Sequence, residues 1–185
     1  TGTPFGIGEA ATISPTPRYQ GIGRWLGEIV ESHHSSGLHV HTEVPDDEDR
    51  IRASNAIRAW LPILLALTGN SPFWGRRDTG YRSWRSILLR RLPTMGAPPV
   101  FHDMTDYHER IARLIRMRAA PDAASVAWAV RLSDRFPTVE VRVFDAQLDV
   151  DDTLFLAVLT RALVTTAPVP TATIDSDVID TSLWM

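Results

Sequence analysis

Two stretches of this chain, residues 37–44 and 138–144, alternate between polar and apolar side chains. Neighbouring residues of a strand point to opposite faces, so each stretch predicts a strand with one apolar and one polar face. If the apolar faces share a core, the polar faces can line one cleft. Five side chains would face it: His39, His41, Glu43, Glu140 and Arg142. Imidazole, carboxylate and guanidinium groups together suit a divalent cation and an anionic substrate.

Most of the remaining chain has the three- and four-residue apolar spacing of amphipathic helices. The acidic run Asp46–Asp49 suits a helix N-terminus, where carboxylates oppose the helix dipole. Pro62 predicts a kink in the helix that follows, and Gly69 predicts its end. The predicted helices cover residues 17–31, 47–68, 81–89, 103–118 and 149–166.

A third strand is predicted over residues 126–132, and residues 1–16, 168–180 and the rest of 70–101 are predicted to be loops. The pattern is α+β, with each strand isolated between helices or loops. Three strands make a thin sheet for so much helix, so we expect further strands from a longer polypeptide or a partner chain. The chain begins without Met, and residues 182–185 have the pattern of a helix start. We therefore expect residues 1–185 to form a single domain or part of one.

Composition excludes several classes of protein. The chain has 185 residues, of which 44% are hydrophobic and 22% charged, as in a globular domain. Its net charge of −3 does not favour nucleic acid, and no apolar run approaches the roughly 20 residues of a membrane span. Cysteine is absent, which excludes disulfides, a thiolate nucleophile and cysteine zinc sites. No targeting segment is visible, so the cytoplasm is the default expectation.

The strand residues each allow a functional and a structural interpretation. His39 and His41 can share a metal, or one can bind metal while the other meets phosphate; alternatively, both are solvated histidines. Glu140 can ligate Mg²⁺ or Mn²⁺ while Arg142 clamps a carboxylate or phosphate. The alternative for this pair is a surface ion pair that contributes little.

Residues 70–85 hold four arginines between glycines and aromatic side chains. The planar guanidinium group suits the anionic parts of a nucleotide or a carboxylate substrate. Alternatively, this stretch is a basic surface loop or a subunit contact, since Arg and aromatic residues are also common at interfaces. The arginines are Arg76, Arg77, Arg82 and Arg85.

An ordered series of segments resembles the carboxylate–amine ligases of the bacterial glutamate–cysteine ligase type, the second glutamate–cysteine ligase family. No single segment is specific, but their order is, and the resemblance covers roughly residues 3–167. The segments are 37–41, 60–67, 70–74, 77–81, 131–133, 136–143, 151–152 and 161–164.

This resemblance implies a glutamine-synthetase-like fold, in which an antiparallel sheet backed by helices lines a funnel-shaped active site. It also implies ATP-dependent amide formation through an acyl phosphate, with Mg²⁺ or Mn²⁺ bridging the phosphates. The implied substrates are small molecules, an amino acid such as glutamate and an amine such as cysteine. Dimers or larger homo-oligomers are also implied.

The same resemblance implies roles for individual residues. Glu140 and His39 would bind metal, and His41 would lie near the nucleotide phosphates. Arg142 would hold the substrate carboxylate or stabilise the acyl phosphate, while Arg85 and Arg77 would contact phosphate or carboxylate.

The chain also departs from the family pattern. The usual opening strand with a Gly-x-Glu-x-Glu motif, which would supply further metal ligands, is absent. Ser36 stands where cysteine is frequent, and Thr42–Glu43 stands where Val-Gly is frequent. We therefore expect a central-to-C-terminal portion of a longer ligase, inactive as an isolated chain. The alternative is a non-catalytic relative that serves in binding or assembly.

Overall fold

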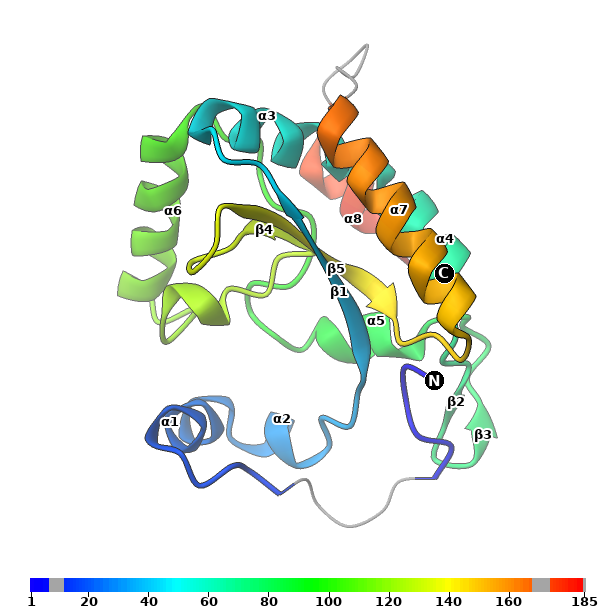
Figure 1. Ribbon diagram of the computed structural model, residues 1–185. Helices are drawn as coiled ribbons and strands as arrows, with labels where there is room; N and C mark the ends of the chain where they lie inside the picture. Colours follow the sequence, from blue (N-terminus) through cyan, green and yellow to red (C-terminus); the bar gives the residue numbers. More distant parts are fainter. Residues whose placement is uncertain (7–11, 168–173, 185) are drawn as a thin grey trace.

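The computed structural model describes residues 1–6, 12–167 and 174–184. A three-stranded antiparallel sheet lies at its centre in the order β1-β5-β4. These strands are β1 (Gly37–Glu43), β5 (Thr138–Asp145) and β4 (Val130–Leu132). Helices cover one face of the sheet (Figure 1). The predicted fold class, α+β with an antiparallel sheet backed by helices, is confirmed.

The register of the sheet brings three polar side chains into one row. His41 of β1 and Arg131 of β4 both pair with Glu140 of the central strand. The pairing of β1 with β5 is irregular, because Leu38 pairs with Phe144 whereas Val40 pairs with Val141. Strand β5 therefore has one extra residue between these pairs, which is a β-bulge at Arg142–Val143.

The apolar faces of β1 and β5 share the core, as the alternation predicts. The buried side chains on these faces include Val40, Val139, Val141 and Val143. They pack beneath α3 (Asp47–Ile57), α4 (Leu61–Thr68) and α7 (Val150–Thr166). In Figure 1 these helices lie together above and to the right of the sheet. The polar face of the sheet is thus left on the other side.

Proline and glycine divide two of the predicted helices. The predicted helix 47–68 is interrupted by a 3₁₀ turn, η1 (Arg58–Trp60), directly before Pro62 in the first turn of α4. This is the expected effect of a proline that cannot donate a backbone hydrogen bond. The predicted helix 17–31 is two helices, α1 (Pro17–Leu26) and α2 (Glu28–Glu31). They are separated by Gly27, whose φ of +55° favours glycine.

Side-chain caps set the starts of three further helices. Asp103 caps α6 (Met104–Arg116) and Asp149 caps α7, close to the predicted boundaries. The short helix predicted from residue 81 begins later, as α5 (Trp84–Leu89), because the Ser83 hydroxyl accepts the Ser86 amide.

Four predictions about local structure are wrong. The third strand has three residues instead of seven, because Ala127 and Ala129 donate their amides to Thr94 and Gly96. The predicted loop 70–101 contains a hairpin, β2 (Phe73–Trp74) and β3 (Arg77–Asp78). The predicted loop 168–180 contains the start of α8 (Ser176–Ser182), and residues 182–184 end that helix instead of opening one. Residues 168–173 and 7–11 lie outside the described part of the chain.

A short 3₁₀ turn, η2 (Ala123–Ser125), precedes β4. Within the described ranges, no helix combines the length and the apolar character needed to cross a membrane.

Candidate functional site

Glu140 is the centre of the polar face of the sheet. Its side chain is only 4% exposed, yet four cationic or potentially cationic groups surround it. Arg131 Nε lies 2.7 Å from Oε2, and His39 Nδ1 and His41 Nε2 lie 3.2 and 3.6 Å from Oε1. Arg142 also pairs with Oε1. The structure therefore brings together four of the predicted site residues, His39, His41, Glu140 and Arg142.

The positive surroundings keep Glu140 ionised. Burial alone raises the pKa of Glu140, but the hydrogen bond from His39 and the charges of Arg142 and Arg131 lower it further than burial raises it. The net effect is a pKa well below the usual range of a glutamate. One carboxylate faces two guanidinium groups, so the cluster retains positive charge that an anionic ligand can neutralise.

The surroundings of His39 favour the neutral form of its imidazole. Its hydrogen bond to Glu140 raises the pKa of His39, whereas burial and the nearby Arg142 and Arg85 lower it. The net pKa lies below the ordinary value of 6.5. A neutral imidazole keeps one nitrogen lone pair, which is the form that binds metal ions.

His41 lies at the outer edge of the sheet. Its Nδ1 atom is 2.9 Å from the Thr138 hydroxyl, which orients the ring with Nε2 toward Glu140. The same residue lines a hollow of about 470 Å³ between β1 and α7. His41 thus borders both the cluster around Glu140 and the hollow between β1 and α7.

A cavity of about 270 Å³ adjoins the cluster on the side of His39. Arg142, Arg85 and His33 also line it, beside apolar side chains of residues 89–95. No carboxylate is among the lining residues within the described ranges. The cavity therefore suits the anionic part of a ligand. A larger hollow of about 660 Å³ between α3 and α6 has Asp47, Glu48 and Asp103 in its wall and lies apart from Glu140.

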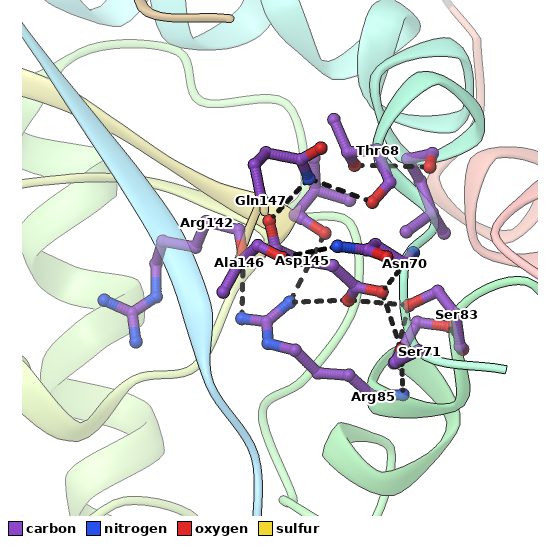
Figure 2. A network of polar contacts seen from close by, with 12 residues as sticks. Thr68, Asn70, Ser71, Ser83, Arg85, Arg142, Asp145, Ala146 and Gln147 are labelled. Atoms are coloured by element: carbon purple, nitrogen blue, oxygen red, sulfur yellow. Dashed lines mark hydrogen bonds and ion pairs between the residues drawn. The ribbon is translucent and has the colours of Figure 1, made fainter. Parts of the chain in front are cut away.

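Arg85 lies beneath this cavity and is 3% exposed. Its guanidinium group donates to the backbone carbonyls of Arg142 and Val143 at 3.2 and 3.4 Å, and lies 3.8 Å from Asp145 (Figure 2). Burial lowers the pKa of Arg85 to about 10, against the opposing effect of Asp145, so the group stays charged at neutral pH. Its Nε atom is buried and has no partner among the described residues.

Arg77 is the predicted site residue that the structure does not bring to the others. It lies on β3 of the hairpin, is exposed, and is absent from the lining of the cavity beside His39.

Sequence reasoning missed two residues that matter to this site. Arg131 pairs with Glu140 at 2.7 Å, and Asp145 lies beside the guanidinium group of Arg85. The position of Arg131 in a predicted strand was a usable signal, since strands in one sheet share a polar face. No local pattern marks Asp145, because its partners come from distant segments.

The geometry fits the outcome of comparing the chain with known proteins. The sequence model of glutamate–cysteine ligase family 2 (GCS2) matches residues 3–179. The chain belongs to this family. The region that matches the glutamate–cysteine ligase family includes the strands of the antiparallel sheet, and with them Glu140 and the polar face around it.

Several similar relatives are provisionally named glutamate–cysteine ligases. One from Nocardia farcinica is 44% identical over 84% of this chain and 40% of its own length. One from Mycolicibacterium smegmatis is 44% identical over 90% of this chain and 46% of its own length. One from Saccharopolyspora erythraea is 40% identical over 98% of this chain and 50% of its own length. The chain spans half or less of the length of these relatives.

A divalent metal, which a ligase family of this kind implies, would find an incomplete set of ligands here. In the parts of the chain that the structure describes, no group of three or more His, Cys, Asp or Glu side chains is arranged to hold a metal ion. Both oxygens of Glu140 already face guanidinium groups. His39 and Glu140 are therefore too few ligands for such a cation within the described residues, and additional oxygen ligands, such as the phosphates of a nucleotide, would be needed.

Proposed function

We propose that this chain carries the anion-binding and part of the metal-binding portion of an ATP-dependent carboxylate–amine ligase. The expected product is an amide, formed from an amino acid such as glutamate and an amine such as cysteine. The family assignment supports the general class, and the names of the relatives suggest the substrate pair.

One observation carries this proposal, which is the excess of positive charge around a single ionised carboxylate. Arg131 and Arg142 both contact Glu140, and Arg142 also lines the adjoining cavity. A structural ion pair would need one guanidinium group for one carboxylate. The additional cations are expected to bind the phosphates of ATP and the carboxylate of the acid substrate.

Each predicted residue has a role in this proposal. Glu140 and His39 would help to hold the divalent cation that enters with ATP, and His41 would lie near the nucleotide phosphates. Arg142 and Arg85 face the transferred phosphoryl group or the substrate carboxylate from the cavity. Arg77 contacts phosphate only if the hairpin β2–β3 moves toward the nucleotide, because it lies apart from the cavity.

The proposed reaction has two steps. A carboxylate oxygen of the acid substrate attacks the γ-phosphorus of ATP; the new bond gives an acyl phosphate, and the bond to the β-phosphate oxygen breaks to release ADP. The amine nitrogen then attacks the acyl carbon, its proton is lost, and phosphate leaves. Mg²⁺ or Mn²⁺ bound to ATP spreads the charge on the phosphates. Arg142 and Arg85 hold the anionic groups in place and Arg131 keeps Glu140 aligned, so that the reacting atoms approach correctly.

The proposed assembly includes protein outside this chain. Strand β1 pairs only with β5 within the described residues and forms one edge of the sheet. A further segment of a longer polypeptide, or a second chain in a homo-oligomer, would supply the missing metal ligands beside His39 and His41. The isolated 185-residue chain is therefore expected to bind nucleotide without turning it over.

Calorimetric titration with Mg–ATP tests this proposal. We expect the wild-type chain to bind, and Glu140→Gln to weaken binding more than about tenfold, since even the residues that support metal ligands have effects of this size. Glu109→Gln, the same change on the exposed side of α6, is the matched control and should bind as the wild type does. Equal affinity in Glu140→Gln and the wild type would remove Glu140 from the metal site.

A non-catalytic relative of the fold is the second candidate. The observation in its favour is that guanidinium groups already occupy both oxygens of Glu140. This candidate predicts that the chain does not bind Mg–ATP. It also predicts that a longer protein containing this chain shows no amino-acid-dependent release of ADP. ADP release by the isolated 185-residue chain would contradict the expectation that further protein is needed.

A further inference from the structure

Asp145, the last residue of β5, gathers a segment that is distant in sequence. The carboxylate is fully buried and accepts hydrogen bonds from the Asn70 amide at 2.9 Å, the Ser71 hydroxyl at 2.6 Å and the Ser83 hydroxyl at 2.9 Å. These donors are 62 to 75 positions away along the chain. Figure 2 shows them converging on Asp145 from the segment that leads into α5.

The same carboxylate faces Arg85, and Arg85 in turn reaches the bulge of β5. The Ser71 hydroxyl that donates to Asp145 also accepts the Arg85 amide at 3.1 Å. The guanidinium group then donates to both carbonyls of the bulge, those of Arg142 and Val143. A bulge leaves backbone groups without ladder partners, so these two hydrogen bonds replace what the sheet cannot supply.

Arg142 is one of the two residues that form the bulge. Strand bulges commonly re-aim a side chain next to an active site. In Figure 2 the carbonyl of Arg142 is held in the network, whereas its side chain extends away from Arg85. That side chain pairs with Glu140 and lines the cavity beside His39.

Two glycines leave room for this network. A Cβ at Gly37 would lie 2.3 Å from Arg85 Nη2, and a Cβ at Gly2 would lie 2.7 Å from Asp145 Cγ. Both distances are shorter than real Cβ contacts allow. The chain therefore comes close to the ion pair from two sides, where larger residues would displace it.

An amide would not replace the carboxylate. Oδ2 accepts from the fixed backbone amide of Asn70, and Oδ1 faces the guanidinium group of Arg85. An asparagine would place its NH₂ group against one of these donors in either orientation, because neither the amide nor the guanidinium can accept a hydrogen bond. The site thus requires two acceptor oxygens and a negative charge.

We propose that Asp145 is a positioning residue, which holds Arg85 across the bulge of β5 and thereby aims Arg142 into the cavity beside His39. This inference rests on the proposed function only for the identity of the ligand that Arg142 contacts. Asp145 itself touches no ligand, since it is buried behind Arg85.

NMR spectroscopy of the ¹⁵N-labelled protein tests this positioning directly. The chemical shift and line width of the side-chain Nε–H signal of Arg142 report on the surroundings of its guanidinium group. Arg142→Lys assigns the signal. We expect Asp145→Asn to shift or broaden it and to weaken binding of Mg–ATP about tenfold, equivalent to about 1.4 kcal/mol. The matched control is Val164→Ala, a core change in α7 that lowers stability without touching the network. It should leave the Arg142 signal and Mg–ATP binding unchanged.

An unchanged Arg142 signal in folded Asp145→Asn would overturn the proposal, and so would an equal change in Val164→Ala. If Asp145→Asn does not fold, Arg85→Lys replaces it, because an ammonium group keeps the charge but cannot span both bulge carbonyls in the same way. The expected signal change and the overturning result are the same for this variant. If the wild type does not bind Mg–ATP, the proposed function fails, while the Arg142 signal still decides the positioning.

Discussion

Strand β5 carries two buried carboxylates, Glu140 and Asp145, in opposite kinds of surroundings. Glu140 contacts Arg131 and Arg142, with His39 and His41 at the solvent side. Asp145 is surrounded by hydroxyl and amide donors and a single guanidinium group. The first cluster has more positive charge than its carboxylate neutralises, whereas the second is balanced. Burial is therefore common to both carboxylates, and it is the local balance of charge that separates Glu140, for which we propose a role in ligand binding, from Asp145.

The largest expected effect is on folding stability, from Asp145→Ala. This change leaves the buried guanidinium group of Arg85 without its carboxylate and should lower the free energy of unfolding by about 3–5 kcal/mol. Glu140→Ala should cost less, about 1–3 kcal/mol, because the side chains of Arg131 and Arg142 are 13% and 23% exposed and can reach water. Urea unfolding of both variants measures the difference. Equal losses would mean that the two carboxylates have the same structural role.

The two clusters also differ in how far their residues lie apart along the chain, and this difference explains which of them the sequence can predict. Alternation along residues 37–43 and 138–142 is a local signal, and it correctly places His39, His41, Glu140 and Arg142 on one face. The core faces and the break before Pro62 follow from equally local rules. Asp145 depends on donors more than 60 positions away, so no spacing rule finds it.

The hairpin β2–β3 was missed for a different reason. Its two-residue turn, Gly75–Arg76, has positive φ at both positions. Turns of this kind usually contain Asn-Gly or Asp-Gly, and an arginine in the left-handed region gives no such signal. The length of β4 was overestimated because residues 126–129 are apolar and buried, although the amides of Ala127 and Ala129 bond to Thr94 and Gly96 instead of to β5.

An intermediate loss of stability is expected from Gly37→Ala, because the new side chain on β1 would collide with the cluster of Asp145 and Arg85. The added methyl group meets the guanidinium group of Arg85, which Asp145 and the bulge carbonyls hold in place. We expect a loss of about 1–3 kcal/mol in thermal or urea unfolding. Gly21→Ala in α1, where nothing lies within 4 Å of the added carbon, is the matched control and should be neutral or stabilising.

Combining changes sharpens this prediction. In an Arg85→Ala background the methyl group at residue 37 has no guanidinium group to displace, so most of the cost of Gly37→Ala should disappear. A cost that persists would place the strain in the backbone of β1 and not at Arg85.

The smallest effect on stability is expected for an ion pair that is exposed to solvent. Arg18 of α1 contacts Asp122 at 3.1 Å, and both side chains are about 40% exposed. Arg18→Ala should therefore lower stability by less than about 1 kcal/mol, and added salt should reduce even this difference. Arg24→Ala, on the same helix and without an ion pair among the described residues, is the control.

The pH dependence of this pair has a defined sign. Partial burial raises the pKa of Asp122, but hydrogen bonds from Ser125 and Arg18 and the charge of Arg18 lower it below the ordinary value. A carboxylate with a depressed folded-state pKa contributes stability above its unfolded pKa of about 3.9, and that contribution is lost as the pH falls through the folded value. The difference between wild type and Arg18→Ala should therefore be present at pH 6 and shrink below about pH 4. A difference that stays the same at low pH would show that Arg18 stabilises α1 through packing and not through its charge interaction with Asp122.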